Sequence, residues 1–464
     1  MFLFLFLINN IVCSEELTIE DDEVIEANDY SSYKLTTKYL TIGKGVKNIS
    51  KKAFTEWPSL EEVKIGDSVL YIDEYAFSEC KNLKNVQLGD SIKGILYGAF
   101  TQTNIEKISL PDSVEELGPS VFLKCSSLKT ITFPNSLKTF GRNLFQDCDN
   151  LQSVTLSQNL ESIPSFCFDN CKNLENIEIP KTVIRIQEHA FDSCYKLDDI
   201  TFSENLQIIE YKAFYCCESL TKITIPSTVT ELGTHVFEQC YSLEEVEYDT
   251  SITIIPESTF NRCDLSEFTI PDTVQTIGAY AFQLCTNLVT VRIGKGVSWI
   301  KDQAFAYCNK LECIYYYGEE SPEYESKAFY SIDTKKVYVS DDYDDDEFCG
   351  MSVKKDSECS VSKELAIPLA LIIVIVVAAV FIVFITIIVC MVLARRRRRR
   401  YGNRSQKASS KKKKKDLYIQ QNNYTEPAQN YTYQQQPQYV PANEYMPQQA
   451  VEVEEAHYDN PYQF

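Results

Sequence analysis

The chain has 464 residues, of which 44% are hydrophobic and 24% are charged, which is ordinary for a folded protein. The tail from Arg395 onward carries 13 Lys/Arg and 7 Asp/Glu, a net charge of +6. The rest carries 32 Lys/Arg and 59 Asp/Glu, a net charge of −27. A region this acidic excludes nucleic acid and anionic glycans as partners of its general surface, and it favours partners with basic patches.

Residues 1–14 are predicted to be a signal peptide. Phe2 to Ile8 form a short apolar core, and Val12 and Ser14 suit the small-residue positions of a cleavage site before Glu15. Because no Lys or Arg precedes the apolar core, an uncleaved anchor and a mis-assigned start stay open as alternatives.

Phenylalanines recur along most of the chain at steps of 22 to 24 residues, which indicates an internal repeat. They are Phe54, Phe77, Phe100, Phe122, Phe145, Phe168, Phe191, Phe214, Phe237, Phe260, Phe282, Phe305 and Phe329. In the unit around Phe191, Ile177 and Ile179 alternate with polar residues, which predicts a short strand with one buried face. Prolines close this strand at the same position of five units, where no ladder donor is needed: Pro111, Pro134, Pro180, Pro226 and Pro271.

The stretch from Val183 to Phe191 carries a second apolar stripe. A single unit cannot bury both stripes, but stacked units with parallel strands bury them in one continuous core. The sequence therefore predicts a repeat solenoid of about 13 coils of 23 residues with a parallel β-sheet, roughly 60 Å long at about 4.8 Å per strand. The first recognisable strand is Leu40 to Ile42, so we expect residues 15–39 to form an N-terminal cap.

Three elements of the repeat resemble a known family. They are Ile-x-Ile-Pro from Ile177 to Pro180, Ile-x-x-x-Ala-Phe from Ile186 to Phe191, and Cys-x-x-Leu from Cys194 to Leu197. They are similar to the BspA-like, Treponema pallidum-type, leucine-rich repeats of surface proteins in mucosal protists and anaerobic bacteria. The resemblance covers residues 40–350, including a closing unit from Lys336 to Gly350. It implies a leucine-rich-repeat fold and adhesion to host cells, matrix proteins or other microbes, whereas the periodicity alone indicates only a solenoid.

Ten of the 17 cysteines lie three residues after a repeat phenylalanine, so we expect them to form a column. They are Cys80, Cys125, Cys148, Cys171, Cys194, Cys217, Cys240, Cys263, Cys285 and Cys308. Parallel side-chain directions give poor disulfide geometry, so buried thiols that fill a tight turn are favoured over disulfides or metal ligands. Cys349 and Cys359 lie outside the column and form the predicted disulfide.

The outward strand positions are the predicted ligand-binding face, because a solenoid sheet presents regularly spaced side chains on a rigid surface. The recurrent threonines there have a simpler explanation in β-propensity, so specificity is assigned mainly to the other residues. The candidate residues are Lys64, Gln87, Lys107, Ser109, Asn176, Glu178, Asp199, Lys222, Glu245, Glu247, Glu267, Arg292 and Tyr315. Tyr315-Tyr316-Tyr317 is read either as an aromatic anchor or as packing in the closing coil.

No catalytic, phosphate-binding or dinucleotide-binding motif is present, so we expect neither enzymatic activity nor a cofactor. His189 and His235 are interpreted as exposed loop residues. The acidic run from Asp341 to Glu347 lacks calcium-loop spacing, and a solvated stretch is favoured over a calcium site. Asn48 begins the one glycosylation sequon expected outside the membrane.

Residues 351–364 are predicted to be a juxtamembrane linker and residues 365–394, which contain no charge, a transmembrane helix. The basic runs that follow, Arg395–Arg400 and Lys411–Lys415, indicate a cytoplasmic side. Residues 395–464 continue as a disordered Tyr/Gln-rich tail, which is read either as inert or as a motif for cytoskeletal or sorting partners. The protein is thus predicted to be a single-pass type I plasma-membrane protein with its N-terminus extracellular and its C-terminus cytoplasmic.

We predict a cell-surface binding protein or adhesin that presents the repeat face to host-cell, matrix or microbial partners. The alternative is a surface receptor for signalling or endocytosis that acts through its tyrosine-rich tail. Either way the expected ligands are proteins or cell surfaces, not nucleic acid.

Overall fold

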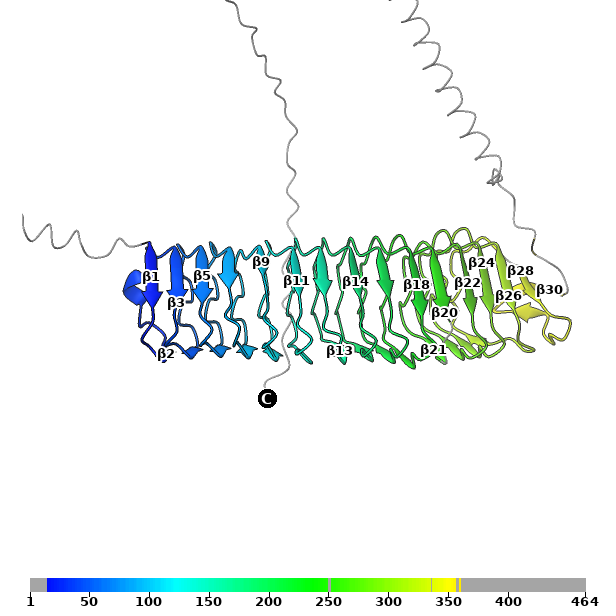
Figure 1. Ribbon diagram of the computed structural model, residues 1–464. Coiled ribbons are helices and arrows are strands. Elements are labelled where there is room, and N and C mark those ends of the chain that lie inside the picture. The colour runs from blue at the N-terminus through cyan, green and yellow to red at the C-terminus, as the bar shows by residue number, and fades with distance from the viewer. Residues whose placement is uncertain (1–14, 249–251, 335, 356–358, 360–464) are drawn as a thin grey trace, which may run out of the picture. The chain divides into compact units, whose positions relative to one another are not determined.

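The computed structural model describes residues 15–248, 252–334, 336–355 and 359. These residues form a parallel β-solenoid of about 14 turns with the leucine-rich-repeat fold, close to the 13 coils expected (Figure 1). The predicted signal peptide, transmembrane helix and tail, and all but residues 351–355 and 359 of the predicted linker, lie outside the described residues.

Strands of two to five residues, most of them three or four residues long, form a main sheet along one side of the array. They belong to three ladders, which comprise nine, two and six strands in order along the chain. These strands are β1 (Glu16–Ile19), β3 (Tyr39–Ile42), β5 (Glu62–Ile65), β7 (Asn85–Gln87), β9 (Lys107–Ile108), β11 (Thr130–Thr132), β12 (Ser153–Thr155), β14 (Asn176–Glu178), β16 (Asp199–Thr201), β18 (Lys222–Ile225), β20 (Glu245–Tyr248), β22 (Glu267–Ile270), β24 (Thr290–Ile293), β26 (Cys313–Tyr316), β28 (Lys336–Val339), β29 (Glu347–Phe348) and β30 (Met351–Lys355).

Two-residue strands form a second row across the core from the main sheet (Figure 1). They pair in parallel in ladders of five, four and four strands. These strands are β2 (Val24–Ile25), β4 (Asn48–Ile49), β6 (Tyr71–Ile72), β8 (Gly94–Ile95), β10 (Glu116–Leu117), β13 (Ser162–Ile163), β15 (Arg185–Ile186), β17 (Ile208–Ile209), β19 (Glu231–Leu232), β21 (Ile254–Ile255), β23 (Thr276–Ile277), β25 (Trp299–Ile300) and β27 (Glu323–Tyr324).

Alternation along each main strand decides which side chains enter the core, because successive residues point to opposite faces. In β5, Val63 and Ile65 are buried while Lys64 faces outward. Parallel pairing one repeat apart places Val63 beside Leu40 and Val86, so each buried position becomes an apolar column. This confirms the strand with one buried face that the sequence pattern predicts.

The repeat phenylalanines form a second column between the two sheets. All 13 stack in sequence, with centroid separations from 5.0 Å (Phe282–Phe305) to 6.0 Å (Phe100–Phe122). Such offset aromatic pairs stabilise a core beyond their buried area, by about 0.5–1.5 kcal/mol each. Phe54 to Phe282 are fully buried, so the column belongs to one continuous core.

Left-handed backbone residues flank the phenylalanine at both the −2 and +2 positions. In the turn around Phe191 these are His189 (φ 53°) and Ser193 (φ 57°). Their N–H groups donate to the carbonyls of Tyr211 and Tyr215 in the next turn, as the N–H group of Phe191 does to Ala213. Twelve turns repeat this pair of left-handed residues, and only one of these positions is a glycine, Gly98. The hydrogen bonds to the next turn therefore hold a conformation that L-residues rarely adopt.

Residues 15–39, which we expected to form a cap, themselves form a turn of the solenoid. β1 pairs in parallel with β3, which places Leu17 beside Leu40 and Ile19 beside Ile42, and β2 pairs with β4. By register, Tyr30 occupies the position of the repeat phenylalanine in this turn, and the short 3-10 helix η1 (Ser31–Tyr33) follows it. The first strand of the array is therefore one turn earlier than the sequence pattern indicates.

The ten predicted column cysteines are free and buried, as expected. Each thiol also donates a hydrogen bond to the carbonyl of the phenylalanine one turn earlier. The Sγ–O distances lie between 3.1 and 3.3 Å, for example 3.2 Å from Cys171 to Phe145. Burial raises the pKa of the Cys171 thiol well above its usual value. The thiols are thus structural donors.

The predicted Cys349–Cys359 disulfide is wrong. Cys359 is bonded to Cys313, with the two Cα atoms 5.9 Å apart, and Cys349 is free. The reason is the position of Cys359, whose N–H donates to the Tyr315 hydroxyl of β26 (3.0 Å). This places Cys359 beside β26, where Cys313 is the first residue.

Replacing Phe191 with alanine should destabilise the solenoid by about 3–5 kcal/mol, because it opens a cavity in the middle of the aromatic column. Chemical denaturation of the variant and the parent chain measures this difference in the free energy of unfolding. The control is Lys196→Ala at an exposed position, which should stay within about 0.5 kcal/mol of the parent. If both variants lowered the free energy of unfolding equally, the phenylalanine column would not be the source of the stability.

Peptide mapping without reductant should recover one cross-linked peptide pair, which joins Cys313 to Cys359. The column thiols should resist alkylation at about pH 8 and react only after denaturation, because burial keeps them protonated and inaccessible. A Cys349→Ser variant serves as the control and should leave the cross-link intact. Recovery of a Cys349–Cys359 peptide, or of disulfides within the column, would contradict the structure.

Candidate functional site

The candidate binding face is the outward side of the main sheet. The structure places all 13 predicted ligand-binding residues there, in the strands or directly after them. Eleven are exposed, and Arg292 and Tyr315 are half-buried. Because the register advances one repeat per strand, the outward residues form two parallel columns. The sequence pattern therefore predicts the location of this face correctly, whereas its binding role stays a prediction.

The face is charged over β18 and β20. The Lys222 ammonium lies 2.9 Å from a Glu247 carboxylate oxygen and 3.1 Å from one of Glu245. The Thr224 hydroxyl donates to the second Glu247 oxygen (2.7 Å). Hydrogen bonds to Glu247 and Glu245 raise the pKa of Lys222, and the bond from Lys222 lowers that of Glu247. Two carboxylates against one ammonium leave this segment with a net negative charge.

Cations and aromatic rings alternate at the C-terminal end of the face. The Arg292 guanidinium is 3.1 Å from a Glu267 oxygen and lies over the Tyr315 ring, 5.6 Å from its centroid. Tyr315 contacts Tyr338 (5.3 Å between centroids), and Lys354 lies over Tyr338 at 5.8 Å. Cation–π contacts of this kind contribute about 0.5–1 kcal/mol at exposed sites. The charged groups therefore already have partners within the chain.

The three consecutive tyrosines separate between different environments. Tyr315 lies half-buried on the face, Tyr316 is in the core with 3% exposure, and Tyr317 is 49% exposed on the turn after β26. Only Tyr315 therefore belongs to the face. Packing into the closing coil is confirmed for Tyr316, and the aromatic anchor stays a prediction for Tyr315.

The middle of the face is neutral and rich in hydroxyl groups. Register places Thr130 beside Ser153 and Thr132 beside Thr155. A shallow hollow of about 280 Å³ lies over β9 and β11, with Lys107 and Asp112 among its lining residues. The face thus changes from neutral in the middle to acidic and then aromatic toward its C-terminal end.

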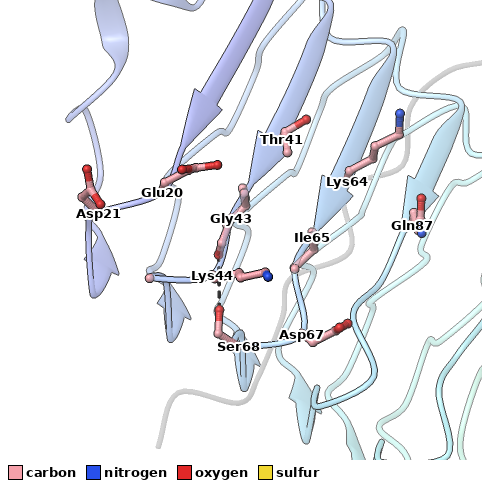
Figure 2. A pocket seen from close by; sticks show the side chains of 13 residues that line it. Glu20, Asp21, Thr41, Gly43, Lys44, Lys64, Ile65, Asp67, Ser68 and Gln87 are labelled. Atoms are coloured by element: carbon pink, nitrogen blue, oxygen red, sulfur yellow. Dashed lines mark hydrogen bonds between the residues drawn. The ribbon is translucent and has the colours of Figure 1, made fainter.

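A larger groove of about 900 Å³ lies where the first main strands turn away from the face (Figure 2). Thr41, Lys64 and Gln87 extend into it from the strands, and Asp67 belongs to the following turn. Charged and polar side chains such as Lys44, Lys64 and Asp67 line it beside three glycines, whereas typical small-molecule pockets are lined mainly by hydrophobic and aromatic side chains. The groove therefore fits a polar contact surface better than an enclosed ligand site.

Glycines set the shape of this groove. A side chain at Gly45 would place its Cβ atom 1.9 Å from the Glu20 carbonyl oxygen, and one at Gly66 would meet the Ile42 carbonyl oxygen at 2.9 Å. The Ser68 hydroxyl donates to the Gly43 carbonyl (3.2 Å, dashed in Figure 2). Backbones of neighbouring turns thus approach closely here because no Cβ atom intervenes.

The remaining predicted positions lie away from the face. Asn48 is half-buried in β4, between β2 and β6, so the sequon lies in a paired strand and its glycosylation stays a prediction. In the acidic run, the Tyr343 ring is buried and Asp345 accepts the Ser321 N–H (2.8 Å). No cluster of three potential metal ligands occurs within the part of the chain that the structure describes.

The two histidines are half-buried rather than exposed. His189 Nδ1 lies 2.8 Å from Asp192, and the His189 ring stacks on Phe166 (4.7 Å) and contacts Tyr211 edge-on (5.2 Å). His235 contacts the other side of Tyr211 at 5.6 Å. The two histidines thus belong to an aromatic ridge beside the phenylalanine column, a role that sequence reasoning missed because they occupy left-handed turn positions.

One carboxyl group beside the ridge, that of Asp169, is expected to make the stability of the fold depend on pH. Burial raises the pKa of Asp169 to about 6, and the charge of Asp192 contributes in the same direction. This pKa is above that of an unfolded aspartate, so the folded chain binds the proton of Asp169 more tightly than the unfolded chain does. The protonated carboxyl therefore stabilises the fold at low pH, and this contribution is lost as the pH rises through about 6.

Asp169→Asn should therefore raise the melting temperature at about pH 7.5 and have little effect at about pH 4.5. The asparagine keeps an oxygen that can accept the hydrogen bond from Gln146 (2.7 Å). Thermal unfolding at both pH values measures the effect, with Asp198→Asn at an exposed position as the control. Destabilisation by Asp169→Asn at the higher pH would contradict the assignment.

Among the described residues, no helix is long and apolar enough to span a membrane. The predicted span, residues 365–394, lies outside these residues.

The chain is similar to several solved leucine-rich repeat proteins, of which the one from Bacteroides ovatus supports the fold. A leucine-rich repeat protein from Bacteroides ovatus is 24% identical, covers 73% of this chain and 95% of its own, and superposes with a TM-score of 0.55. A leucine rich cell surface protein from Faecalibacterium prausnitzii is 24% identical over 67% of this chain and 88% of its own, with a TM-score of 0.40. A leucine-rich repeat protein from T. pallidum is 23% identical over 49% and 83%, with a TM-score of 0.29. A comparison with curated proteins finds no match.

The sequence matches the family model of the BspA type leucine-rich repeat region (6 copies) at residues 9–129, 47–174, 119–244, 161–289 and 253–345. These matches run without a gap from residue 9 to residue 345, well over half of the chain. The chain therefore belongs to the BspA-type leucine-rich-repeat family.

Proposed function

We propose that this protein is a cell-surface binding protein, an adhesin, which presents the outward face of its main sheet to protein partners. The observation that carries the proposal is the face itself, a long row of exposed side chains on a backbone whose every turn is bonded to the next. Such a surface provides binding by shape and charge over a large area. We infer binding rather than catalysis.

The charge pattern indicates the kind of partner. Glu178 and Asp199 are exposed on adjacent strands, and the acidic residues around Lys222 follow two strands later. Electrostatic complementarity governs specificity and association rate more than affinity does. We therefore propose folded partners with basic patches, on host cells, in extracellular matrix or on other microbes.

Surface display is the second part of the proposal and rests on the sequence. We propose that residues 1–14 direct export and that residues 365–394 span the plasma membrane once. The basic run after Ala394 would then keep the tail in the cytoplasm. The repeat array would be outside the cell, where the face is accessible to partners.

The test is a double charge reversal on the face, Glu178→Lys with Asp199→Lys, in the full chain expressed on non-adherent cells. Binding to host cells and to matrix proteins should fall roughly tenfold, because two carboxylates that attract a basic partner become repulsive. Adhesion under flow measures the change, and antibody staining of intact cells checks display.

The matched control is Glu116→Lys with Glu231→Lys, the same charge change at exposed positions of the second row. It should bind like the parent chain. Adhesion that is lost in the control and kept in the face variant would contradict the proposed face, and a parent chain that binds none of the surfaces would contradict the adhesin function.

A further inference from the structure

The turn after β26 departs from the repeat. From the last core-facing residue of the main strand to the second residue of the next short strand, the chain advances seven positions in two preceding turns, Ile270 to Ile277 and Ile293 to Ile300. The corresponding step is eight positions, from Tyr316 to Tyr324, which pairs with Ile300 but is exposed. The buried valine of those turns, Val274 or Val297, is replaced by the exposed Glu320. This turn therefore extends outward where its neighbours pack inward.

The departure is a structured loop. The Tyr316 hydroxyl lies 3.2 Å from the Val297 carbonyl and 2.9 Å from that of Glu320. Gly318 is required beside it, because an added Cβ atom would lie 2.1 Å from the hydroxyl oxygen. The Asp344 N–H donates to the Glu319 carbonyl (2.9 Å), so a hydrogen bond from the acidic run also holds the loop. The loop is thus held in place without a ligand.

A groove of about 670 Å³ lies between this loop and the preceding turn. Trp299 and Tyr317 line it, and their side chains are 41% and 49% exposed. Register places Trp299 directly beside Glu323. The Lys301 ammonium lies over the Trp299 ring, 4.8 Å from its centroid, so this ring already accepts one cation from its own chain.

The groove is acidic as well as aromatic. Glu319, Glu320 and Glu323 line it, against one basic residue, Lys295. Within the described ranges, none of these three carboxylates forms a salt bridge. This differs from the C-terminal part of the main face, where Glu245, Glu247 and Glu267 are paired with Lys222 or Arg292.

We propose that this groove is a second binding site, which accepts arginine side chains from a basic segment of a partner protein. The aromatic rings offer a face to a planar guanidinium, and the unpaired carboxylates accept its hydrogen bonds. An anionic ligand would be repelled, and a neutral glycan would leave the three carboxylates without a role. The site lies beside the second row of strands and is independent of the main-sheet face.

The experiment titrates the full chain, purified in detergent micelles, with the blocked peptide Gly-Arg-Gly-Arg-Gly. Tryptophan emission reports binding, because Trp57, the other of the two tryptophans, is buried at 2% exposure and provides only background. We expect a saturable change in emission that weakens as salt is added. The same peptide with citrulline in place of arginine, which keeps the shape and loses the charge, should bind much more weakly.

Two variants locate the site. Glu320→Gln with Glu323→Gln should raise the dissociation constant at least about fivefold, and Trp299→Leu should abolish the emission change and weaken binding measured by calorimetry. The matched control is Glu116→Gln with Glu231→Gln on the same row of strands, which should bind like the parent. The face variant Glu178→Lys with Asp199→Lys should also bind like the parent, which separates this site from the adhesive face.

Three results would overturn the proposal. They are equal binding of the arginine and citrulline peptides, an unchanged affinity in the Glu320/Glu323 variant, and no response to the arginine peptide at all. Binding of a neutral oligosaccharide such as chitotetraose in place of the peptide would assign the groove to glycans instead. Circular dichroism of each variant establishes that the fold is intact before the affinities are compared.

Discussion

The pair of left-handed residues around each phenylalanine is the constraint on which the rest of the solenoid depends. Each such non-glycine residue is disfavoured by about 1–2 kcal/mol, yet twelve consecutive turns contain the left-handed pair, and Gly98 is the one glycine among these positions. The conformation directs three N–H groups per turn, such as those of His189, Phe191 and Ser193, to carbonyls of the next turn. Those bonds fix the spacing at which phenylalanine rings stack, and the fixed spacing keeps both sheets in register. A turn therefore cannot hold this conformation alone, which makes stacking and local folding one event.

The cysteine column follows from the same geometry. The phenylalanine carbonyl faces the next turn, and a side chain three residues after the next phenylalanine reaches it. The group must be small and able to donate a hydrogen bond, which a thiol satisfies. Thr103 occupies the position once, and it bonds to Phe100 of its own turn instead and lies 3.3 Å from Cys125 Sγ. The column is thus selected by space and hydrogen bonding, which explains why its thiols are unpaired while Cys313 and Cys359, outside the column, form a disulfide.

The sequence predicts most of this architecture because apolar periodicity reports burial directly. It identifies the phenylalanine column, the buried cysteines and the outward residues of each main strand. The prediction fails for features that depend on contacts between distant residues, because the periodicity does not report such contacts. The first turn lacks the phenylalanine marker and is recognisable only through its pairing with β3. The partner of Cys359 depends on which strand Cys359 lies beside, which is β26. Left-handed turns at residues such as His189 have no signature in residue type, because the hydrogen bonds that hold them come from the backbone.

Specificity in such an array arises in two different ways. On the main face the backbone is constant, so outward side chains vary with little effect on packing, and recognition depends on their sequence of charge, hydroxyl and aromatic groups. Toward the C-terminal end the backbone itself changes, because the Tyr316 hydroxyl holds an eight-residue step that regular turns do not have. The first mechanism yields a broad surface that adapts by substitution, and the second yields a single groove. Because each turn contacts mainly its neighbours, changes at one surface need not propagate to the other, so the two surfaces are free to bind different partners.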